Sequence, residues 1–371
     1  MTDNTDKRIL IAGAGITGLA LAALLERKGI IADVVEKAPD WKRRGYGITV
    51  MPAGLRVLRE LGALGEVRGA GASAAGLEMR DAEGLPVRHL ALKAGGIDSV
   101  TLARADLHSI LRSHLHKTPV RMGVEVRSLR QDGGKVNVSF STGPAQDYDL
   151  VIGADGIRSQ VRRCIFPDAE PQYAGTAVWT FFLPDGVGLP SRQDVQQVWN
   201  DGEFMGIFPF RHTAAVTFSA PLDSHTDVNA VDLRQRFADI HFLAKDILAK
   251  VSNGRMYAGY LNEIKLHDWY DGRVLLAGDA AHAMLPATGM GSSMGLADAQ
   301  AIADLIISCD DQEWEVLPQL YQHKRKRQTD RIQREAYLVT QGIFVGGPLK
   351  GVRDGATKLV PQFVVSHVLN R

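Results

Sequence analysis

Short apolar runs alternate with helical patterns along much of the chain, and this alternation predicts an α/β fold. The run RILIAG (8–13) has the composition of a buried parallel strand, and IADVVEKA (31–38) predicts a second strand. A helical pattern between them extends to about Lys28 and is ended by Gly29. Two later segments, 148–163 and 274–299, each have an apolar strand, an acidic turn and then a helix, the last opening at about Gly291. The outer parts of the chain therefore read as strand–helix units.

Between residues 173 and 262 the pattern changes to alternation broken by turns, which predicts an inserted antiparallel sheet. Alternate aromatic side chains share one face of a strand in two places, and these are Phe204, Phe208 and Phe210 in one strand and Trp179 and Phe181 in another. Residues 231–250 have the spacing of an amphipathic helix, and a further helix is expected from Pro318 onward.

The composition excludes several classes of protein. A chain of 371 residues, 45% hydrophobic and 23% charged, is expected to form one large or two medium globular domains. The net charge of +1 gives no overall attraction to nucleic acid or to an anionic membrane. The protein is expected to be a monomer or a homodimer. Cys164 and Cys309 form no disulfide framework, zinc spacing or dithiol motif, so we expect a reducing cytoplasm and no bound metal.

One segment, residues 7–29, could be interpreted as a signal peptide or a membrane span because basic residues precede an apolar stretch. The apolar part, Ile9 to Leu25, contains three glycines, is short for a span and is followed by a second strand pattern. We therefore expect this segment to belong to the fold and not to insert stably in a membrane.

The turn after the first strand, GAGITG, places Gly13, Gly15 and Gly18 in GxGxxG register. The first glycine permits a tight turn, the second lets a pyrophosphate approach the backbone, and the third lets helix and strand pack closely. The helix that follows offers free N–H groups and a partial positive charge to phosphates. Glu36, at the end of the second strand, can accept hydrogen bonds from an adenosine ribose and would repel a 2′-phosphate. The sequence therefore predicts a Rossmann-like dinucleotide site, with a structural glycine turn as the alternative.

Three further motifs follow GxGxxG along the chain. Arg104 in SVTLARADLHSIL (99–111) comes just before a helix that is expected to open at about Asp106. GADGIRSQVR ends the strand of 148–163, and GDAAHAMLP follows the strand that begins at Val274. With these motifs the chain resembles the single-component FAD-dependent aromatic hydroxylases, the para-hydroxybenzoate hydroxylase group. In length and layout it looks most similar to the small quinolone and nicotinate hydroxylases and the tetracycline-degrading monooxygenases.

The resemblance implies a role for each matching position. Asp279 matches the aspartate that binds the flavin ribityl chain, and Arg104 matches the arginine beside the FAD phosphates and ribityl chain. Asp155 matches the aspartate that supports the FAD and NAD(P)H region, and Val126 matches a strand that meets the adenine. The residues expected to bind non-covalent FAD are Gly13, Gly15, Ile16, Thr17, Gly18, Glu36, Lys37, Arg43, Arg44, Gly47, Arg104, Val126, Asp155, Gly278, Asp279, Pro286, Gly289, Met290, Gly291, Ser292 and Ser293.

The implied organisation is a discontinuous FAD-binding domain of residues 1–75, 100–172 and 265–330. A substrate-binding domain would comprise 76–99 and 173–264, and residues 331–371 would form a C-terminal helical segment. Aromatic side chains of the inserted sheet would line the substrate pocket, and the candidates are Trp179, Phe181, Phe204, Phe208 and Phe210, with Thr49 from the segment after the second strand. For any one aromatic the alternative is an ordinary core position.

Several of these residues also have ordinary structural interpretations. Arg104 could cap or pair with a surface helix, Asp155 could belong to a simple Asp-Gly turn, and His282 is expected to be a packed loop histidine. The basic helix after Pro318 is expected to be a solvated or interdomain face. The apolar run near the C-terminus could pack on the body of the protein or touch a membrane surface.

The implied reaction is hydroxylation of an aromatic or polycyclic small molecule with NAD(P)H and O2, through a flavin C4a-hydroperoxide. NAD(P)H would be a transient reductant, because no second GxGxxG is present. The helix after the glycine-rich turn 289–293 would direct its positive end toward the reduced flavin. Thr49 would be a hydrogen-bonding residue and not a base near neutral pH. The family commonly has GxGxN in this turn, where the chain has Met290 second and Ser293 in place of asparagine. Ser293 can still cap a helix.

Three other functions share some of these features. A flavin halogenase would carry WxWxIP near the middle of the chain, whereas VWTFFLP lacks the second tryptophan and the isoleucine. An FAD-dependent reductase of the geranylgeranyl type would not activate oxygen. A flavin-binding sensor or scaffold would have no turnover at all.

Overall fold

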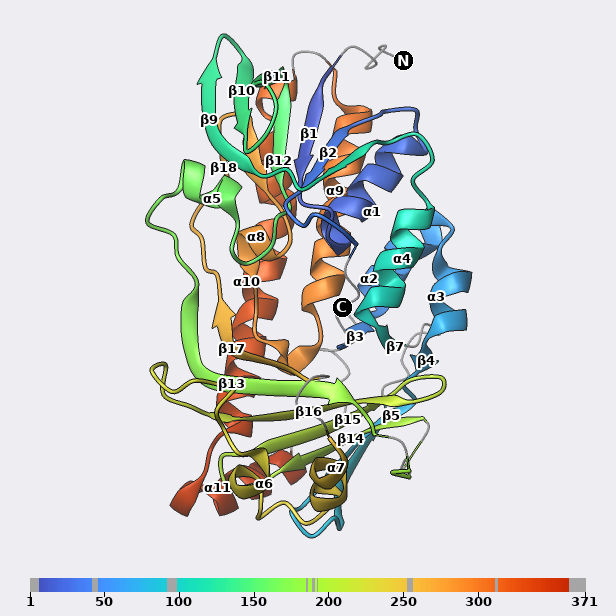
Figure 1. Cartoon of the computed structure of the whole chain (residues 1–371), viewed down its shortest axis with the longest axis vertical. Coiled ribbons are helices and arrows are strands. Elements are labelled where there is room, and N and C mark those ends of the chain that lie inside the picture. The colour runs from blue at the N-terminus through green and yellow to red at the C-terminus, as the bar shows by residue number, and fades with distance from the viewer. Residues whose placement is uncertain are drawn as a thin grey trace.

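The computed structural model describes residues 7–41, 46–91, 99–184, 186–188, 191, 193–251, 256–310 and 313–359 (Figure 1). The elements up to the inserted sheet are β1 (Ile9–Ala12), α1 (Ile16–Glu26), β2 (Asp33–Glu36), β3 (Gly47–Val50), α2 (Pro52–Leu61), α3 (Leu64–Ala70), β4 (Ala72–Ser73), β5 (Gly76–Arg80), β6 (Pro86–Ala91), β7 (Val100–Ala103), α4 (Arg104–Ser113), β8 (Val120–Met122), β9 (Val126–Asp132), β10 (Lys135–Phe140), β11 (Gln146–Tyr148), β12 (Leu150–Gly153) and α5 (Gln160–Ile165). The remaining elements are β13 (Gln172–Phe182), β14 (Asp194–Trp199), β15 (Phe204–Pro209), β16 (Ala214–Pro221), α6 (Leu233–Arg236), α7 (Ala244–Lys250), β17 (Tyr257–Glu263), β18 (Tyr270–Asp271), β19 (Val274–Leu276), α8 (Asp279–His282), α9 (Gly291–Ser308), α10 (Leu317–Ile343) and α11 (Lys350–Leu359), with short 3-10 turns at η3 (Pro286–Thr288), η4 (Glu313–Glu315) and η5 (Gly347–Leu349).

A six-stranded sheet in the order β18-β19-β12-β1-β2-β8 forms one layer of the molecule. All neighbouring strands in it are parallel except the edge pair of β18 and β19. Strands β1 and β12 are apolar or glycine throughout and buried at every position, as is typical of a parallel sheet that is covered on both faces. The parallel sheet confirms the α/β class predicted from the alternating pattern.

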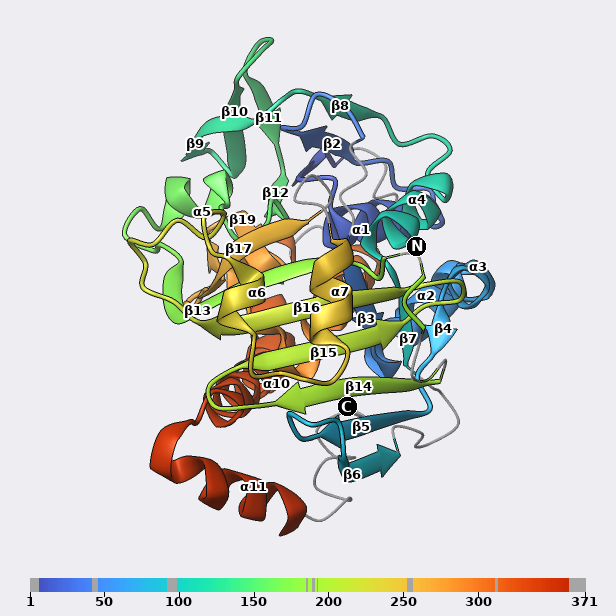
Figure 2. The ribbon, with the colours of Figure 1, turned by 60° about the horizontal axis from the view of Figure 1, so that its bottom comes forward.

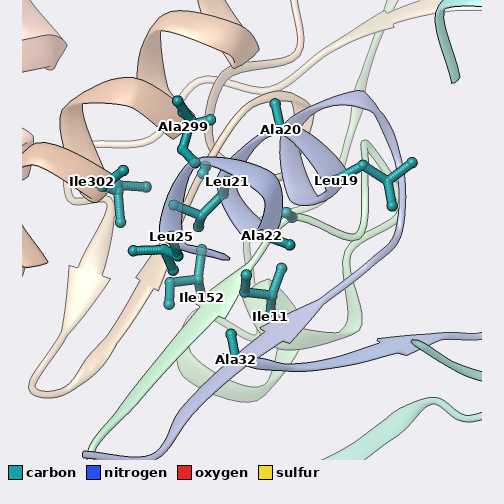
Figure 3. Close-up of a cluster of buried hydrophobic side chains, with 14 of the residues drawn as sticks. Ile11, Leu19, Ala20, Leu21, Ala22, Leu25, Ala32, Ile152, Ala299 and Ile302 are labelled. Atoms are coloured by element: carbon teal, nitrogen blue, oxygen red, sulfur yellow. The ribbon is translucent and has the colours of Figure 1, made fainter. Parts of the chain in front are cut away.

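Helix α1 is buried because it lies between this sheet and helix α9 (Figure 3). It is apolar on nearly all sides, so no face of it is suited to solvent. Leu21 and Leu25 lie near Ala299 and Ile302 of α9, and Ile152 of β12 lies beneath them. The packing of α1 against α9 brings the first glycine-rich turn close to the segment that follows β19.

A seven-stranded sheet in the order β17-β13-β16-β15-β14-β5-β6 forms the second layer. Strands β13 to β17 are antiparallel to their neighbours, as predicted, whereas β5 joins β14 in parallel. Figure 2 shows α6 and α7 over one face of this sheet, which we call the outer face, with the parallel-sheet layer on the other side. Strands β5 and β6 thus extend the inserted sheet, but the domain boundaries given above remain a proposal.

The single amphipathic helix expected over residues 231–250 is wrong, since two short helices, α6 and α7, occupy this stretch. Asp232 caps α6 with its side chain, and the chain then turns away from helical geometry. The backbone N–H groups of His241 and Phe242 donate to the Ala82 carbonyl, and Leu243 has a positive φ of 55°. Contact with the β5–β6 hairpin therefore overrides the helical spacing.

The helix expected after Pro318 is present as α10, which extends from the parallel sheet toward the seven-stranded sheet (Figure 1). Gln333 in this helix donates to the carbonyl groups of Ile264 and Ala283, at 2.6 and 3.0 Å. Arg353 of α11 donates to the carbonyl groups of Trp199 and Asn200, so the last described helix is anchored on β14. Among the described residues, no helix combines the length and apolar character needed to cross a bilayer.

Candidate functional site

The GxGxxG turn has the geometry that its three glycines predict. Gly13 has a φ of 105°, and a Cβ there would lie 2.4 Å from the Ala154 carbonyl oxygen. A Cβ on Gly18 would lie 1.9 Å from the Gly13 carbonyl oxygen, so only glycine fits. A Cβ on Gly15 would instead meet nothing within 4 Å. Space for a ligand thus lies in front of Gly15, at the first turn of α1.

A cleft brings together residues predicted from separate parts of the sequence. It is lined by Ala12, Gly13, Gly15, Val35, Glu36, Lys37, Arg104, Val124, Glu125, Val126, Ala154, Asp155 and Gly156. The lining comes from the carboxyl ends of β1, β2 and β12, the start of α4, and the start of β9. Ligands of open α/β sheets bind at this edge. Of the residues predicted to bind the cofactor, Gly13, Gly15, Glu36, Lys37, Arg104, Val126 and Asp155 line this cleft.

Glu36 is fixed in the cleft by two backbone groups. Its carboxylate accepts hydrogen bonds from the N–H groups of Ala14 and Ala38, each at 2.9 Å. Each carboxylate oxygen can accept more than one hydrogen bond, so capacity for ribose hydroxyl groups remains. His108 of α4 donates from Nε2 to the Ala14 carbonyl at 2.8 Å, and burial lowers the pKa of this histidine. The sequence analysis did not identify His108 as a residue near the site. Its position one helical turn after Arg104, on the same side of α4, could have indicated it.

The segment GADGIRSQVR forms a turn held by its own acidic residue. Asp155 Oδ2 accepts from the N–H groups of Gln160 and Val161, at 2.7 and 3.2 Å. Its Oδ1 is buried and has no hydrogen-bond partner among the described residues. Burial raises the pKa of Asp155, and its polar neighbours, Ser159 and the backbone N–H groups, offset part of the rise. Asp155 is thus more than an ordinary turn residue, because half of its carboxylate is left for a ligand or water.

Arg162 connects this segment to the segment GDAAH. It is fully buried and donates to three carbonyl groups, those of Ile157, Ala169 and Ala280. The planar guanidinium can serve three acceptors at fixed angles, which a lysine could not do. The arginine at the end of GADGIRSQVR therefore fixes the two motifs relative to each other.

The Arg162→Met variant is expected to lower the free energy of unfolding by about 3 kcal/mol, because three buried carbonyl groups lose their donor. The neighbouring variant Arg163→Met is the matched control. Arg163 pairs with Glu170 at the surface, and its loss should change stability by less than about 1 kcal/mol. Denaturant unfolding of both variants checks the difference, and equal effects would contradict the assignment.

Asp279 begins helix α8, directly after Gly278, which has a φ of 58°. The carboxylate is surrounded by protein, yet its side chain stays accessible, as in the wall of a deep cleft. Burial raises the pKa of Asp279, and the charges of His282 and Arg104 offset part of that rise. Among the described residues, no group donates a hydrogen bond to this carboxylate. Thr17 of α1 fills the space beside Gly278, where a Cβ would lie 2.5 Å from its hydroxyl oxygen.

The glycine-rich turn before α9 lies against strand β3. Gly289 has a φ of 65° and faces Thr49, and Met290 precedes the first residue of the helix, Gly291. Pro286 is exposed and begins the turn η3 just before it, and Thr288 ends that turn in a buried position. The expectation that Ser293 caps the helix is wrong, because this fully buried hydroxyl accepts from the Met51 N–H at 2.9 Å.

Ser292 has a similar role, since its hydroxyl donates to the Thr49 carbonyl at 3.0 Å. Ser292 therefore attaches α9 to β3 and Ser293 attaches it to Met51 at the start of α2, and no side chain caps the first turn of α9. The uncapped N–H groups remain for a ligand. Gly47 of β3 in turn contacts the inserted sheet, because a Cβ there would lie 2.5 Å from the Phe210 ring.

The aromatic candidates separate onto two faces of the seven-stranded sheet. Trp179 and Phe181 lie in the core under α6 and α7, with at most 1% exposed surface. Phe204 and Phe208 have the opposite orientation, since they pair with Ser219 and Ala215 on the face toward β3. We call this the inner face. Trp179 and Phe181 therefore do not reach the pocket that the sequence placed them in. Phe210, at the end of this strand, packs between the inner face and Gly47.

Four more residues were expected in the site, and they are Arg43, Arg44, Thr49 and Ile16. Arg43 and Arg44 lie outside the described residues. Thr49 is half-buried, and its hydroxyl forms a 3.1 Å hydrogen bond with the hydroxyl of buried Thr101 in β7. Ile16 begins α1, so it lies beside Gly15 at the same turn.

The arrangement fits FAD, the cofactor that the resemblance implies. The space in front of Gly15 suits a pyrophosphate, Asp155 Oδ1 has no partner among the described residues, and the first turn of α9 is uncapped. Glu36 and Asp279 lie at the ends of two strands of one sheet, so an extended dinucleotide could contact both.

Comparisons with known proteins agree with this fit. A family model described as an FAD binding domain matches residues 6–336. The chain is 30% identical to 2-heptyl-3-hydroxy-4(1H)-quinolone synthase of Pseudomonas aeruginosa, over 95% of this chain and 94% of that protein. It is 33% identical to 3-amino-4-hydroxybenzoate 2-monooxygenase of Streptomyces cremeus, over 94% and 91% of the two chains.

A solved structure has the same fold. HpxO of Klebsiella pneumoniae, in complex with FAD and uric acid, superposes with a TM-score of 0.87 at 21% identity, over 98% of this chain and 96% of that one. The sequence relatives and the matching family model together cover nearly the whole chain. The chain belongs to the FAD-binding family of single-component flavin-dependent aromatic monooxygenases.

Proposed function

We propose that this protein uses NAD(P)H and O2 to hydroxylate a small aromatic or polycyclic molecule. The observation that carries the proposal is that the inner face meets β3, where Phe210 and Ala215 lie against Gly47, and that Thr49 of β3 faces Gly289 in the glycine-rich turn before α9. An FAD held by the cleft would extend toward that turn, so its reactive ring would lie between the two layers. Bound FAD, once reduced, supplies the activation of O2, and the protein supplies binding, orientation and exclusion of water.

The roles proposed for the cofactor-binding residues follow from their positions. Gly15 and the first turn of α1 bind the pyrophosphate, and Glu36 accepts from the adenosine ribose. Arg104 adds positive charge near the phosphates, and Asp279 accepts from the ribityl hydroxyl groups. Asp155 supports the same region with its unpartnered oxygen.

The start of α9 is proposed to stabilise negative charge at the pyrimidine edge of the flavin. Helix N-termini carry a partial positive charge, and Gly289 and Gly291, which have no side chain, would let the backbone lie close to the ring. Ser292 and Ser293 keep this end of the helix in place through their bonds to Thr49 and Met51. In this chain their hydroxyl groups thus act on the scaffold, and the backbone N–H groups act on the cofactor.

The substrate pocket is proposed to consist of Phe204, Phe208 and Phe210 with Thr49. Phe204 and Phe208 flank Gly206, and both rings lie over it, since a Cβ there would be 2.7 Å from the Phe208 ring and 2.9 Å from the Phe204 ring. Tyr257 and the hydrogen-bonded pair Thr180 and Thr217 share this face and were missed by sequence reasoning. The names of two relatives refer to planar ring compounds, a quinolone and a hydroxybenzoate. HpxO was solved with another planar compound, uric acid. We propose that Thr101 orients the Thr49 hydroxyl toward a polar group of such a ring.

Two phenylalanine variants are expected to separate the faces of the sheet. Phe208→Ala should raise the KM for the substrate about tenfold, because it removes one ring from the pocket. Phe181→Ala should lower the free energy of unfolding by about 3–5 kcal/mol, because it leaves a cavity under α6 and α7. Steady-state kinetics and thermal unfolding of both variants check this. A larger KM effect in Phe181→Ala at a temperature where it is folded would contradict the assignment.

One set of assays tests the proposed function. Purified protein with FAD and NAD(P)H is followed for NAD(P)H oxidation and O2 uptake, with and without a library of phenols, quinolones and polyketides. Substrate-stimulated oxidation with product oxygenation supports the hydroxylase. Substrate reduction under argon would indicate a reductase, halide-dependent product formation a halogenase, and the absence of any turnover a binding protein.

A further inference from the structure

A buried carboxylate lies directly beneath the Gly278-Asp279 turn. Asp298 of α9 has no exposed surface. Its Oδ2 accepts hydrogen bonds from the Gly278 N–H at 3.0 Å and from His282 Nε2 at 2.5 Å. Its Oδ1 accepts from Arg325 Nε of α10 at 2.8 Å. One side chain therefore binds the residue before α8, the last residue of α8, and a third helix.

The charge of Asp298 is compensated within the core. Arg325 is 7% exposed and is the cation opposite this carboxylate. Burial alone would raise the pKa of Asp298, but the charges and hydrogen bonds of His282 and Arg325 lower it to about 2. A buried ion pair of this kind is weak support for stability, because desolvation offsets much of the attraction. Its position therefore needs another explanation than stability alone.

The two oxygens of Asp298 have different partners, and this division indicates the role. If Asp298 only joined α9 to α10, the contact of its Oδ1 with Arg325 would be sufficient. Oδ2 is directed instead at both ends of α8. His282 packs on Trp269 with ring centroids 4.8 Å apart, and its Nδ1 has no partner among the described residues. Asp298 is therefore the hydrogen-bond partner that orients the imidazole.

We propose that Asp298 is a positioning residue of the FAD site, which holds Gly278 and His282 and thereby fixes the Asp279 carboxylate against the ribityl chain. This inference rests on the proposed contact of Asp279 with FAD. The Gly278-Asp279 turn is also packed closely on its other side, because Thr17 occupies the space that a Cβ on Gly278 or on Gly295 would need. Loss of the Asp298 contacts would therefore displace Asp279 within a rigid surround.

Two variants separate positioning from stability. In Asp298→Asn the single amide oxygen is drawn to Arg325, so the NH2 group faces the Gly278 N–H and the His282 ring. In Arg325→Met the cation is lost, but a protonated carboxyl can still accept at Oδ2. Each variant leaves a buried polar group without its partner, so both should lower the unfolding temperature of the apoprotein.

FAD affinity is the readout that distinguishes them, measured by fluorescence titration of the apoprotein. Asp298→Asn should weaken FAD binding about tenfold to hundredfold and change the visible circular dichroism of the bound flavin. Arg325→Met should keep the FAD affinity and the flavin spectrum of the parent protein. Asp304→Asn is the matched control, since Asp304 pairs with Lys324 between the same two helices at the surface.

His282→Gln provides a second variant if Asp298→Asn does not fold. It removes one Oδ2 contact and leaves the ion pair with Arg325, so a smaller loss of FAD affinity is expected. The proposal is overturned if FAD affinity falls in step with stability in Asp298→Asn and Arg325→Met alike, or if neither Asp298→Asn nor His282→Gln weakens binding. Asp279→Asn, titrated in parallel, reports on the proposed function itself. If it binds FAD normally, the contact of Asp279 with the ribityl chain is wrong. If Asp298→Asn alone loses affinity, the route through Asp279 is overturned.

Discussion

Gly15→Ala is expected to fold like the parent protein and to lose most of its affinity for FAD, by about a hundredfold or more. Gly15 has a φ of −78°, which alanine adopts without strain, and an added Cβ would meet no protein atom within 4 Å. The same methyl group would occupy the space where the pyrophosphate approaches the backbone. The variant therefore changes the ligand site and leaves the apoprotein intact.

Gly18→Ala is the matched control three positions later in the same turn. Its Cβ would lie 1.9 Å from the Gly13 carbonyl oxygen and 3.3 Å from Ile11 Cγ2, so β1 and α1 would have to separate. We expect this variant to lose both FAD binding and cooperative unfolding. Circular dichroism of the apoproteins and FAD fluorescence titration measure the two effects. Normal FAD binding by Gly15→Ala would show that the cofactor lies elsewhere.

Asp279→Asn is expected to weaken FAD binding about tenfold to hundredfold, because a charged acceptor for ribityl hydroxyl groups becomes a neutral amide. The apoprotein should become more stable than the parent, since the surrounding protein disfavours the charged form of this side chain, as its raised pKa indicates. These opposite changes distinguish a ligand-binding carboxylate from a structural one. A variant with lower apoprotein stability and unchanged FAD affinity would contradict the role.

The same variant gives a prediction about pH. Burial raises the pKa of Asp279 in the folded apoprotein, so this group stabilises the fold at pH values below its ordinary pKa. That contribution is lost as the pH rises through the raised pKa. The proposed contact favours the ionised form of Asp279, so the affinity for FAD should increase over the same window, and Asp279→Asn should not show this increase. Asp155 also has a raised pKa but is present in both proteins, so the difference between the two pH profiles isolates Asp279.

The sequence predicted the local geometry around the proposed cofactor site, because the relevant residues lie at strand ends, while their contacts with FAD stay a prediction. Gly13, Gly18 and Glu36 follow directly from a strand–turn–helix–strand pattern, and parallel strands bring their carboxyl ends to one edge. The residue types in such turns are restricted by backbone geometry, as the φ of Gly13 and the close contact at Gly18 show. The position of Asp279 was predictable for the same reason.

The substrate half was less predictable, because alternation along a strand shows that two faces exist but not which one is covered. Trp179 and Phe181 belong to the face under α6 and α7, whereas Phe204 and Phe208 belong to the inner face. Which face is covered depends on the two short helices α6 and α7, where the sequence pattern predicted a single helix. The sequence pattern also could not predict contacts between side chains that are distant along the chain. The contact of Ser293 with Met51 and that of Asp298 with Arg325 form only when α9 packs beside the end of β3 and against α10.

The most direct test of the proposed monooxygenase activity is the mass of the product formed under isotopically labelled O2. Holoenzyme with FAD, NAD(P)H and an aromatic substrate that stimulates NAD(P)H oxidation should yield a product containing one labelled oxygen atom. The label should be absent when labelled water and ordinary O2 are used instead. A product without label from O2, or a substrate that is reduced equally well under argon, would contradict the proposed function.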